Sequence, residues 1–351
     1  EVNHSISRAE LTRQLVLHAG RTPGITLHFL QRCTGIDTDG SLQLHDESSG
    51  RECRVTADRI IGADGAGSAL RKAMAAGGQV TASNDLLDHD YKELTIPAVQ
   101  GRSALAVREA LHIWPRRNFM LIALPNADSS FTATLFMPRT GPVSFEALDA
   151  PGAAREFFAR EFADALALMP DFEREYAAHR QGILGTVRCS PWNLAEKVVL
   201  VGDAAHAIVP FHGQGLNCAL EDCRLLDAFL ADGLDAPFAR FAAARRADAE
   251  AIAAMSLENY GEMRDEVLDP RHQVQREVEL QLERRHPGRF IPRYAMVMFH
   301  DDIPYSLALQ RGRVQQQILD QLVPEGIAAG GAAVDWKLAD RLVMEHLAPL
   351  A

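Results

Sequence analysis

An apolar run that ends in glycine and aspartate constrains the fold of this chain more than any other segment. Residues 198–201 are continuously apolar, which is typical of a short strand buried in a parallel sheet. Gly202-Asp203 follows at once, so the carboxylate is expected at the carboxyl end of the strand. Open α/β sheets bind ligands at this edge, and the segment therefore predicts an α/β domain with a ligand site there.

A glycine-rich loop completes this segment. Gly213-Gln214-Gly215 precedes Leu216-Asn217 and a helical stretch that runs to about Leu230. Backbone amides at the start of a helix can approach an electron-rich ring edge, and the positive end of the helix dipole favours negative charge there. Core packing does not require Gly-Asp followed by His-Gly-Gln-Gly at this spacing. The segment therefore indicates a binding site rather than a purely structural loop.

A second strand–turn–helix segment lies earlier in the chain. Residues 59–62 are expected to form a strand, Ala63-Asp64-Gly65-Ala66-Gly67 a turn, and a helix follows from Ser68. Glycines let the backbone approach a bulky anionic ligand, and the start of the helix supplies amides for phosphate. The Asp64 carboxylate is placed to bond a sugar hydroxyl or to orient the turn. Taken alone, this segment is equally compatible with an ordinary strand–turn–helix connection that binds no ligand.

The composition limits the classes of function. There are 47 acidic and 36 basic residues, so the net charge is −11, and no basic block appears, which argues against nucleic-acid binding. The five cysteines lack the spacing of metal ligands or of a disulfide framework, so reduced thiols are expected and no metal site. Neither a signal-peptide pattern nor an apolar run of bilayer length is present. Together these features predict a cytoplasmic protein.

The order of elements predicts four stretches. Residues 1–80 are expected to form the remaining part of a nucleotide-binding domain, to which residues 186–235 return. Residues 81–185 are expected to form an antiparallel sheet, and residues 236–351 a helical region.

Particular runs support this division. Short polar turns separate three strand-like runs at residues 111–114, 119–124 and 131–137, which favours a separate antiparallel meander. Residues 25–29 are also expected to be a strand. Residues 153–169 read as a helix, and the C-terminal helices are expected to break at Pro287-Gly288 and near Pro292.

The two glycine-containing segments resemble the second and third fingerprints of the single-component, FAD-dependent aromatic hydroxylases. In that family the aspartate matching Asp203 bonds the ribityl chain of FAD, and the loop matching residues 210–217 lies against the isoalloxazine. The segment matching Asp64-Gly65 serves the pyrophosphate and the reduced nicotinamide cofactor. The resemblance implies a cofactor site made of Asp64, Gly65, Gly202, Asp203, Pro210, Gly213, Gln214, Gly215, Leu216 and Asn217.

Four further runs resemble the kynurenine 3-monooxygenases, one family within this class. They are residues 90–94, 111–116, 122–126 and 258–264, and the resemblance extends over nearly the whole chain. It implies a site for L-kynurenine. Apolar residues form a wall for the aromatic ring, a second group closes the site on the side of the flavin, and polar groups bind the amino-acid carboxylate. The implied residues are Leu111, Ile122, Leu124 and Phe136 for the wall, Pro210, Phe211 and His212 for the closure, Asn259 and Tyr294 for the carboxylate, and Met263 beside them.

Each of these residues also has a structural interpretation. Phe136 and the aliphatic residues fit an ordinary core, and for any one of them that is the commoner role. Met263 fits helix packing. Tyr91 and Lys92 lie in a polar run and fit an exposed surface.

The resemblance also implies the chemistry. NADPH reduces FAD, and the reduced flavin captures O₂ as a C4a-hydroperoxide, whose distal oxygen attacks the ring carbon ortho to the amino group to give 3-hydroxykynurenine. The protein positions the ring and excludes water, so no side-chain nucleophile and no metal are expected. Two alternatives remain open: a hydroxylase of another aromatic acid, of the salicylate type, and a truncated, non-catalytic homologue.

The first fingerprint of that family, Gly-x-Gly-x-x-Gly after an N-terminal strand, is not found in these residues. The predicted fold is therefore an α/β, Rossmann-like FAD-binding domain of the aromatic hydroxylase type, here lacking its first βαβ unit, with an antiparallel-sheet substrate domain and C-terminal helices. The arginine that pairs with the substrate carboxylate in that family is expected in the same upstream unit. A polypeptide that truly begins at Glu1 is expected to bind FAD weakly.

Overall fold

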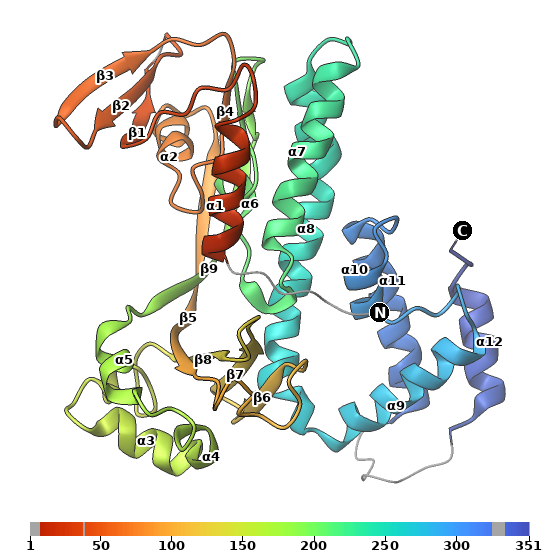
Figure 1. Cartoon of the computed structure of the whole chain (residues 1–351). Coiled ribbons are helices and arrows are strands. Elements are labelled where there is room, and N and C mark those ends of the chain that lie inside the picture. The colour runs from red at the N-terminus through yellow and green to blue at the C-terminus, as the bar shows by residue number, and fades with distance from the viewer. Residues whose placement is uncertain (1–7, 38, 325–333, 351) are drawn as a thin grey trace. The chain divides into compact units, whose positions relative to one another are not determined.

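The computed structural model describes residues 8–37, 39–324 and 334–350 and divides into two compact units (Figure 1). The first, here called the sheet unit, contains the chain up to His112 and Ile122–Arg246. The second, the helical unit, contains Ile113–Leu121 and the chain from Ala247 onward.

A small mixed sheet forms the centre of the sheet unit. Its order is β10 (Asn193–Leu194), β11 (Val198–Leu200) and β4 (Ile60–Gly62), and β11 runs parallel to β4. All three residues of β11 are buried, as the continuous apolar run predicts for a parallel strand. Leu200 lies opposite Gly62, so the two strands end at the same edge of the sheet.

An antiparallel three-stranded sheet precedes β4. It consists of β1 (Gln31–Ile36), β2 (Leu42–Asp46) and β3 (Arg51–Val55) and follows helix α1 (Arg8–Ala19), none of whose residues is buried. The prediction of a strand at residues 25–29 is wrong. This segment joins none of the sheets formed by the described residues, so it has no ladder of hydrogen bonds that would make it a strand.

The largest sheet has five strands. Its order is β6 (His112–Pro115), β7 (Met120–Pro125), β8 (Phe131–Pro138), β5 (Thr81–Ile96) and β9 (Gly182–Ser190). The three predicted runs become β6, β7 and β8, which are neighbours in chain order.

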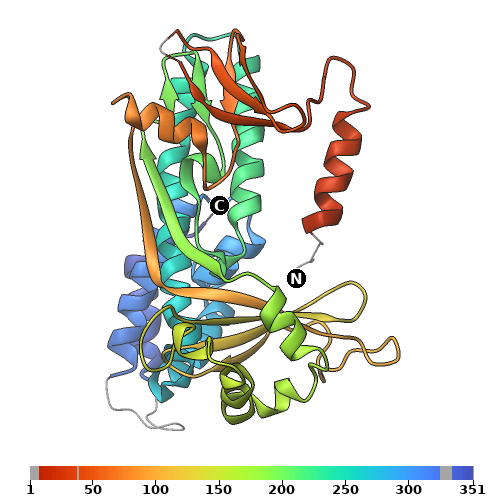
Figure 2. The same ribbon diagram turned by 90° about the vertical axis from the view of Figure 1, so that its left-hand side faces the viewer.

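The longest strand, β5, escaped prediction because its first half is polar and exposed. β5 lies beside β9 over most of its length, as Figure 2 shows, and pairs antiparallel with β9 and with β8. The register with β9 shifts between Leu86 and Asp90, and Tyr91 then lies opposite Phe136 on β8. A single strand thus links the two halves of this sheet.

Helices, most of them short, connect the strands. The helix predicted at residues 153–169 is two helices separated at Phe162. The helices are α2 (Ala69–Ala76), α3 (Ala153–Glu161), α4 (Ala163–Leu166), α5 (Phe172–Ala178), α6 (Asp203–His206) and α7 (Gly215–Ala231), with 3-10 turns at Glu146–Leu148 and Pro210–His212.

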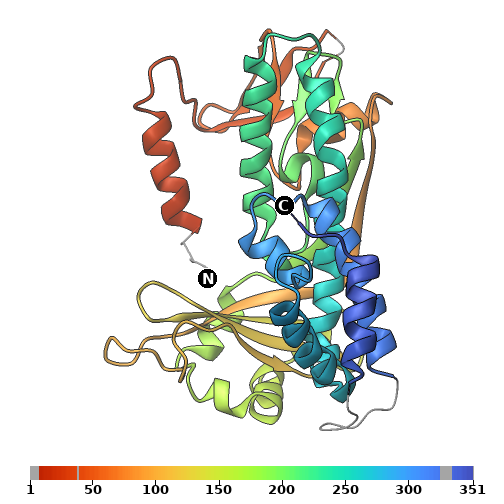
Figure 3. The ribbon, with the colours of Figure 1, turned by 90° about the vertical axis from the view of Figure 1, so that its right-hand side faces the viewer.

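The helical unit begins within a long helix, α8 (Pro237–Arg264), whose first turns belong to the sheet unit and run beside α7 (Figure 3). A 3-10 turn (Glu266–Leu268) leads into α9. The predicted breaks are confirmed, since α9 ends before Pro287 and α10 begins after Pro292. The remaining helices are α9 (Pro270–Arg285), α10 (Arg293–Phe299), α11 (Tyr305–Leu322) and α12 (Trp336–His346).

This unit has a hydrophobic core of its own, built from α9, α11, α12 and the segments between them. Its fully buried members include Leu282, Phe290, Val323 and Val343. Among the residues that the structure describes, no helix combines the length and the apolar character needed to cross a bilayer.

Candidate functional site

The two glycine-containing turns meet at one edge of the small sheet. Because β4 and β11 are parallel neighbours, their carboxyl ends lie together, and the Val201 amide donates to the Gly62 carbonyl over 3.0 Å. Asp64 follows β4 and Asp203 follows β11. The structure therefore brings together two predicted segments that are far apart in sequence, at the edge where open α/β sheets bind ligands.

Asp64 orients its turn by capping helix α2. One carboxylate oxygen accepts from Ser68 Oγ (2.6 Å), and the other accepts from the amides of Ala69 (2.8 Å) and Leu70 (3.2 Å). Ser68 Oγ in turn accepts from the Arg71 amide. These bonds satisfy the free amides of the first helical turn. Of the two roles expected for Asp64, bonding a sugar hydroxyl or orienting the turn, the structure shows the second.

Glycines leave open space around both turns. A Cβ atom placed on Gly65, Gly67 or Gly213 would meet no atom of the chain within 4 Å. Gly65 and Gly213 also have φ values of +79° and +66°, which L side chains rarely adopt. The backbone here is bare on its open side, and this fits a bulky ligand such as FAD lying against it.

Asp203 stands at the entrance to this space. It is the first residue of α6, and its side chain is exposed, although the residues around it are buried. Gly202 before it has φ +56° and ψ −142°, a conformation that only glycine adopts readily. The sharp turn at Gly202 directs the chain away from β11 and leaves the Asp203 carboxylate available to a ligand.

The loop after α6 leads to the start of α7. Pro210 is exposed, whereas Gln214 is buried and its Oε1 accepts from Asn217 Nδ2 over 3.1 Å. Leu216 and Asn217 lie exposed in the first turn of α7. The first amides of an α-helix have no partner within the helix, so this end can donate to electron-rich ligand atoms.

Arg71 joins the two turns. It is almost fully buried, and its guanidinium donates to the carbonyls of Ala66 (2.5 Å) and Ala204 (2.6 Å). Ala66 lies in the turn after β4, and Ala204 follows Asp203. The sequence analysis gave Arg71 no role, although its place at the end of the first glycine-rich segment was visible.

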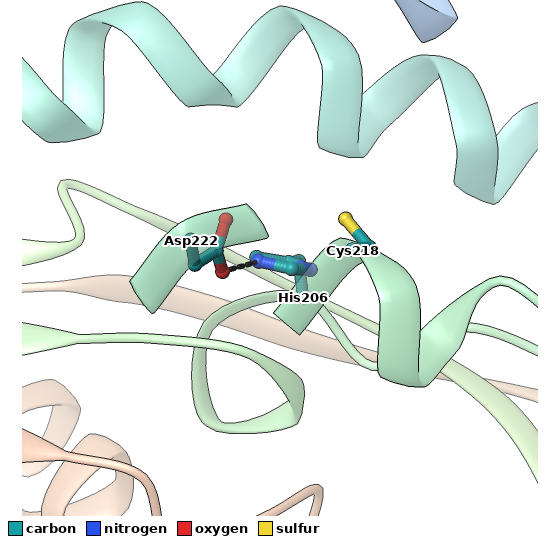
Figure 4. A group of neighbouring side chains, drawn as sticks. All are labelled: His206, Cys218 and Asp222. Atoms are coloured by element: carbon teal, nitrogen blue, oxygen red, sulfur yellow. Dashed lines mark hydrogen bonds and ion pairs between the residues drawn. The ribbon is translucent and has the colours of Figure 1, made fainter. Parts of the chain in front are cut away.

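A buried polar group lies at the end of the short helix that Asp203 begins, and Figure 4 shows its members His206, Cys218 and Asp222. Asp222 on α7 accepts from His206 Nε2 (2.6 Å), from the Gly202 amide (2.9 Å) and from Arg245 Nε (2.8 Å). Arg245 also pairs with Glu221 over 2.9 Å. Burial alone would lower the pKa of His206, but the hydrogen bonds to Asp222 and Cys218 and the charge of Asp222 raise it to about 9.

His206, Cys218 and Asp222 are close enough together to suggest metal ligands. However, the Arg245 guanidinium lies against two of them, bonded to Asp222 and 3.3 Å from Cys218 Sγ. A fixed positive charge in this position opposes a second cation. The group is better described as an ion-pair network. From the sequence Arg245 is expected on a solvated helix face, which is wrong because it is 1% exposed and bonded to Asp222. Asp222 has no local sequence signal, since charged residues are rarely buried unless paired.

The proposed ring-binding residues of the sheet unit fall into two groups. Phe136 and Phe211 are buried and in contact, with ring centroids 5.0 Å apart, and the Tyr91 ring centroid lies 6.0 Å from that of Phe136. Ile122 and His212 are also buried. Leu111 and Leu124 are 42% and 47% exposed and so remain accessible.

The remaining candidate residues belong to the helical unit. Asn259 and Met263 are buried on one face of α8, and Asn259 Nδ2 lies 3.6 Å from Met263 Sδ. Tyr294 lies on α10 with 39% of its surface exposed. The structure thus brings Asn259 and Met263 together and leaves part of Tyr294 accessible.

The chain is similar in sequence to a known family and to named relatives. The family described as "FAD binding domain" matches residues 3–253. Kynurenine 3-monooxygenase of Stenotrophomonas maltophilia (strain K279a) is 46% identical over 91% of this chain and 70% of its own length. The enzymes of the same name from Xanthomonas axonopodis pv. citri (strain 306) and Myxococcus xanthus (strain DK1622) are 44% and 42% identical, over 100% and 99% of this chain and 77% and 75% of their own lengths.

Solved structures share the fold at low sequence identity. The tetrameric form of 2-methyl-3-hydroxypyridine-5-carboxylic acid oxygenase has a TM-score of 0.59 at 22% identity, covering 76% of this chain and 69% of its own. Klebsiella pneumoniae HpxO, complexed with FAD and uric acid, has a TM-score of 0.54 at 16% identity, covering 97% and 71%. These likenesses confirm the predicted fold class of an FAD-binding α/β domain with an antiparallel sheet and C-terminal helices.

The sequence identities reach well beyond the FAD-binding segment into the C-terminal helices. Family membership therefore rests on nearly the whole chain and not on the two glycine-rich turns alone. The chain belongs to the kynurenine 3-monooxygenase family of FAD-dependent aromatic monooxygenases.

Proposed function

We propose that this protein hydroxylates L-kynurenine to 3-hydroxykynurenine. FAD is the cofactor of monooxygenases of this type, and NADPH and O₂ are their co-substrates. The observation that carries the proposal is the edge where Asp203 and three glycines with open space around them meet.

The five cysteines are free thiols, which supports a cytoplasmic setting, where thiols stay reduced.

The chain's own residues hold the cofactor in this proposal. Asp203 would accept from the ribityl hydroxyls of FAD, and the amides at the start of α7 would donate toward its isoalloxazine. Gly65 and Gly67 allow the backbone to approach the pyrophosphate side and the nicotinamide cofactor. When bound, FAD supplies the redox chemistry by which O₂ is activated.

Other residues position the substrate and exclude water. The Phe136–Phe211 pair, Ile122 and the exposed Leu111 and Leu124 offer the apolar surface for the aromatic ring. Beside this wall, Pro210 and His212 close the flavin side. Asn259 and Tyr294 are assigned to the amino-acid carboxylate, with Met263 packed against Asn259.

Substrate-stimulated NADPH oxidation tests the reaction. The enzyme, expressed from its intact gene, is assayed with L-kynurenine, salicylate and 4-hydroxybenzoate, and the products are identified by mass spectrometry. We expect L-kynurenine to stimulate oxidation most and to gain one oxygen at the 3-position. Hydroxylation of salicylate instead, or NADPH oxidation without any hydroxylated product, would contradict the proposal.

The assignment of Asp203 has a separate test. Asp203→Ala should weaken FAD binding, because the ribityl hydroxyls lose a charged acceptor, and the loss is expected to be about tenfold or more. The flavin absorbance that remains per protein after gel filtration measures this. Full retention of FAD by the folded variant would show that Asp203 is not a cofactor ligand.

A further inference from the structure

Asp222 contacts both ends of the short helix that carries Asp203. One of its oxygens accepts from the Gly202 amide, immediately before α6, and from His206 Nε2, at the last residue of α6. The amides of Ala205 and His206 both donate to the Gly202 carbonyl, so the helix itself is one tight turn. A single carboxylate oxygen therefore fixes where this turn begins and where it ends.

Neighbouring groups hold Asp222 in place. Its second oxygen accepts from Arg245 Nε on α8, and Arg245 is 1% exposed. α7 also packs closely on the turn, since a Cβ atom on Gly202 would lie only 3.0 Å from Ala219 Cβ. Trp192 covers His206 with its ring centroid 4.8 Å away. The turn can shift only if this packed arrangement shifts with it.

Asp203 is the one exposed residue of α6, within a turn whose other residues are buried. Its carboxylate takes its direction from the backbone at Gly202, because the Asp203 side chain makes no hydrogen bond or ion pair with any residue that the structure describes. We propose that Asp222 is a positioning residue for FAD: it sets the direction of the Asp203 carboxylate by holding the Gly202 amide and His206 at once. This inference rests on the proposed role of Asp203 as a cofactor ligand.

A purely structural role would have a different consequence. If the network only stabilised the fold, FAD affinity would fall in step with thermal stability for every variant of it. If Asp222 positions Asp203, FAD affinity depends on the bonds from Asp222 to Gly202 and His206 rather than on the bond to Arg245. The two roles therefore separate when Asp222 and Arg245 are changed independently.

The experiment measures the FAD dissociation constant and the apoprotein Tm of variants of the full chain, expressed from the intact gene and stripped of FAD. Asp222→Asn should weaken FAD binding by about tenfold or more, since a charged acceptor of two hydrogen bonds becomes a neutral one. Arg245→Lys should lower Tm but keep FAD affinity within about threefold, because Asp222 keeps Gly202 and His206. The control is Asp227→Asn, which removes a charge at an exposed position of α7 and should change neither quantity.

A double-mutant cycle with Asp203→Asn tests the route of the effect. If Asp222 acts through Asp203, the double variant should lose little more FAD affinity than whichever single variant binds FAD less tightly. The reason is that the effects of interacting residues are not additive. Additive losses, or FAD affinity unchanged in a folded Asp222→Asn protein, would overturn the inference. If Asp222→Asn does not fold, Asp222→Glu keeps the charge but displaces the carboxylate, and the same expectations and the same overturning outcomes apply to it.

The cycle also separates this inference from the function proposed above. An unchanged FAD affinity in Asp203→Asn would refute the role of Asp203 itself. A loss in Asp203→Asn without a loss in Asp222→Asn would refute only the positioning role. The substrate does not enter either measurement.

Discussion

Three aspartates of the same edge have three different tasks because their surroundings differ. Asp64 is exposed but caps α2, Asp222 is buried in an ion-pair network, and Asp203 is exposed and takes part in no side-chain hydrogen bond or ion pair among the described residues. Asp203 is therefore the carboxylate of the three that we assign to a ligand. Residue type alone did not distinguish them, and the distinction comes from what each carboxylate already bonds.

At the same scale, Tyr294 carries a prediction about the substrate. Tyr294→Phe should raise KM for L-kynurenine several-fold and leave kcat nearly unchanged, because a lost hydrogen bond to the carboxylate weakens substrate and transition state alike. Steady-state kinetics with Tyr176→Phe as the control measure this. An unchanged KM would remove Tyr294 from the carboxylate site.

The charge state of His206 gives a pH prediction. Its pKa rises from an ordinary value of 6.5 to about 9 in the folded protein, so it stabilises the fold fully below pH 6.5 and loses this contribution as the pH rises through about 9. The shift corresponds to about 3 kcal/mol. Asp222 and Cys218 contact this imidazole, and Arg245, which stays charged throughout, pairs with Asp222 and Glu221.

The Tm of the apoprotein should therefore fall more steeply between pH 7 and pH 10 for the unmodified protein than for His206→Gln. Glutamine can still donate to Asp222 but does not titrate. Equal slopes for the two proteins would show that His206 is neutral in the fold.

Among the elements, the β4–α2 connection separates glycines that serve packing from glycines that serve a ligand. A Cβ on Gly62 would lie 2.7 Å from Leu70 Cδ2 and 2.8 Å from Leu200 Cδ2, both of them buried, whereas a Cβ on Gly67 would meet nothing. Gly62→Ala should thus cost about 1–3 kcal/mol of stability through overpacking. Thermal unfolding of the apoprotein measures it.

Gly67→Ala is the matched variant in the same turn. It should leave the apoprotein Tm unchanged and weaken FAD or NADPH binding, because the added methyl group occupies space reserved for the ligand. If Gly67→Ala binds both nucleotides as tightly as the parent, the open side of this turn is not a nucleotide site.

Elements with a local signal were predicted well, and elements held by distant partners were not. The β11 strand and its glycine-rich loop were evident from residues that adjoin in sequence. Strand β5 was not, since its middle depends on Asp90, which binds Arg139 through both oxygens (2.9 and 3.0 Å) and Gln181 (2.6 Å) at the register shift. Lys92 beside it donates to the carbonyls of Tyr176 and His179, so a run that looked like surface is anchored by long-range contacts.

The candidate site shows the same limit. Resemblance gave the proposed cofactor ligands, because their types and spacing form a motif. It gave none of the buried residues that support those turns. Arg71 and Asp222 hydrogen-bond to the turns directly, and Arg245 bonds to Asp222. Their partners are main-chain carbonyls, a main-chain amide and side chains, and the most distant partner lies more than a hundred residues away in sequence. No local pattern encodes such contacts.

For the whole molecule, the division into two units predicts that stability and cofactor affinity can be changed separately. Leu282 on α9 is fully buried in the core of the helical unit, whereas every proposed FAD ligand lies in the sheet unit. Leu282→Ala should cost about 2–5 kcal/mol and leave the FAD dissociation constant within about twofold. Calorimetry and FAD titration measure the two effects, and Leu280→Ala, at an exposed position of the same helix, is the control. A large loss of FAD affinity in Leu282→Ala would show that the units do not behave separately.

The guanidinium of Arg71 has a mechanical consequence. Its two terminal nitrogens donate to carbonyls in two turns, one after β4 and one after β11. Displacing either turn would therefore strain the hydrogen bonds that Arg71 makes. Lysine carries one ammonium group in place of this planar fork and could not span both acceptors in the same way. The loop that follows β4 and the loop that follows β11 are thus coupled through Arg71, and a displacement of one is expected to be shared by the other.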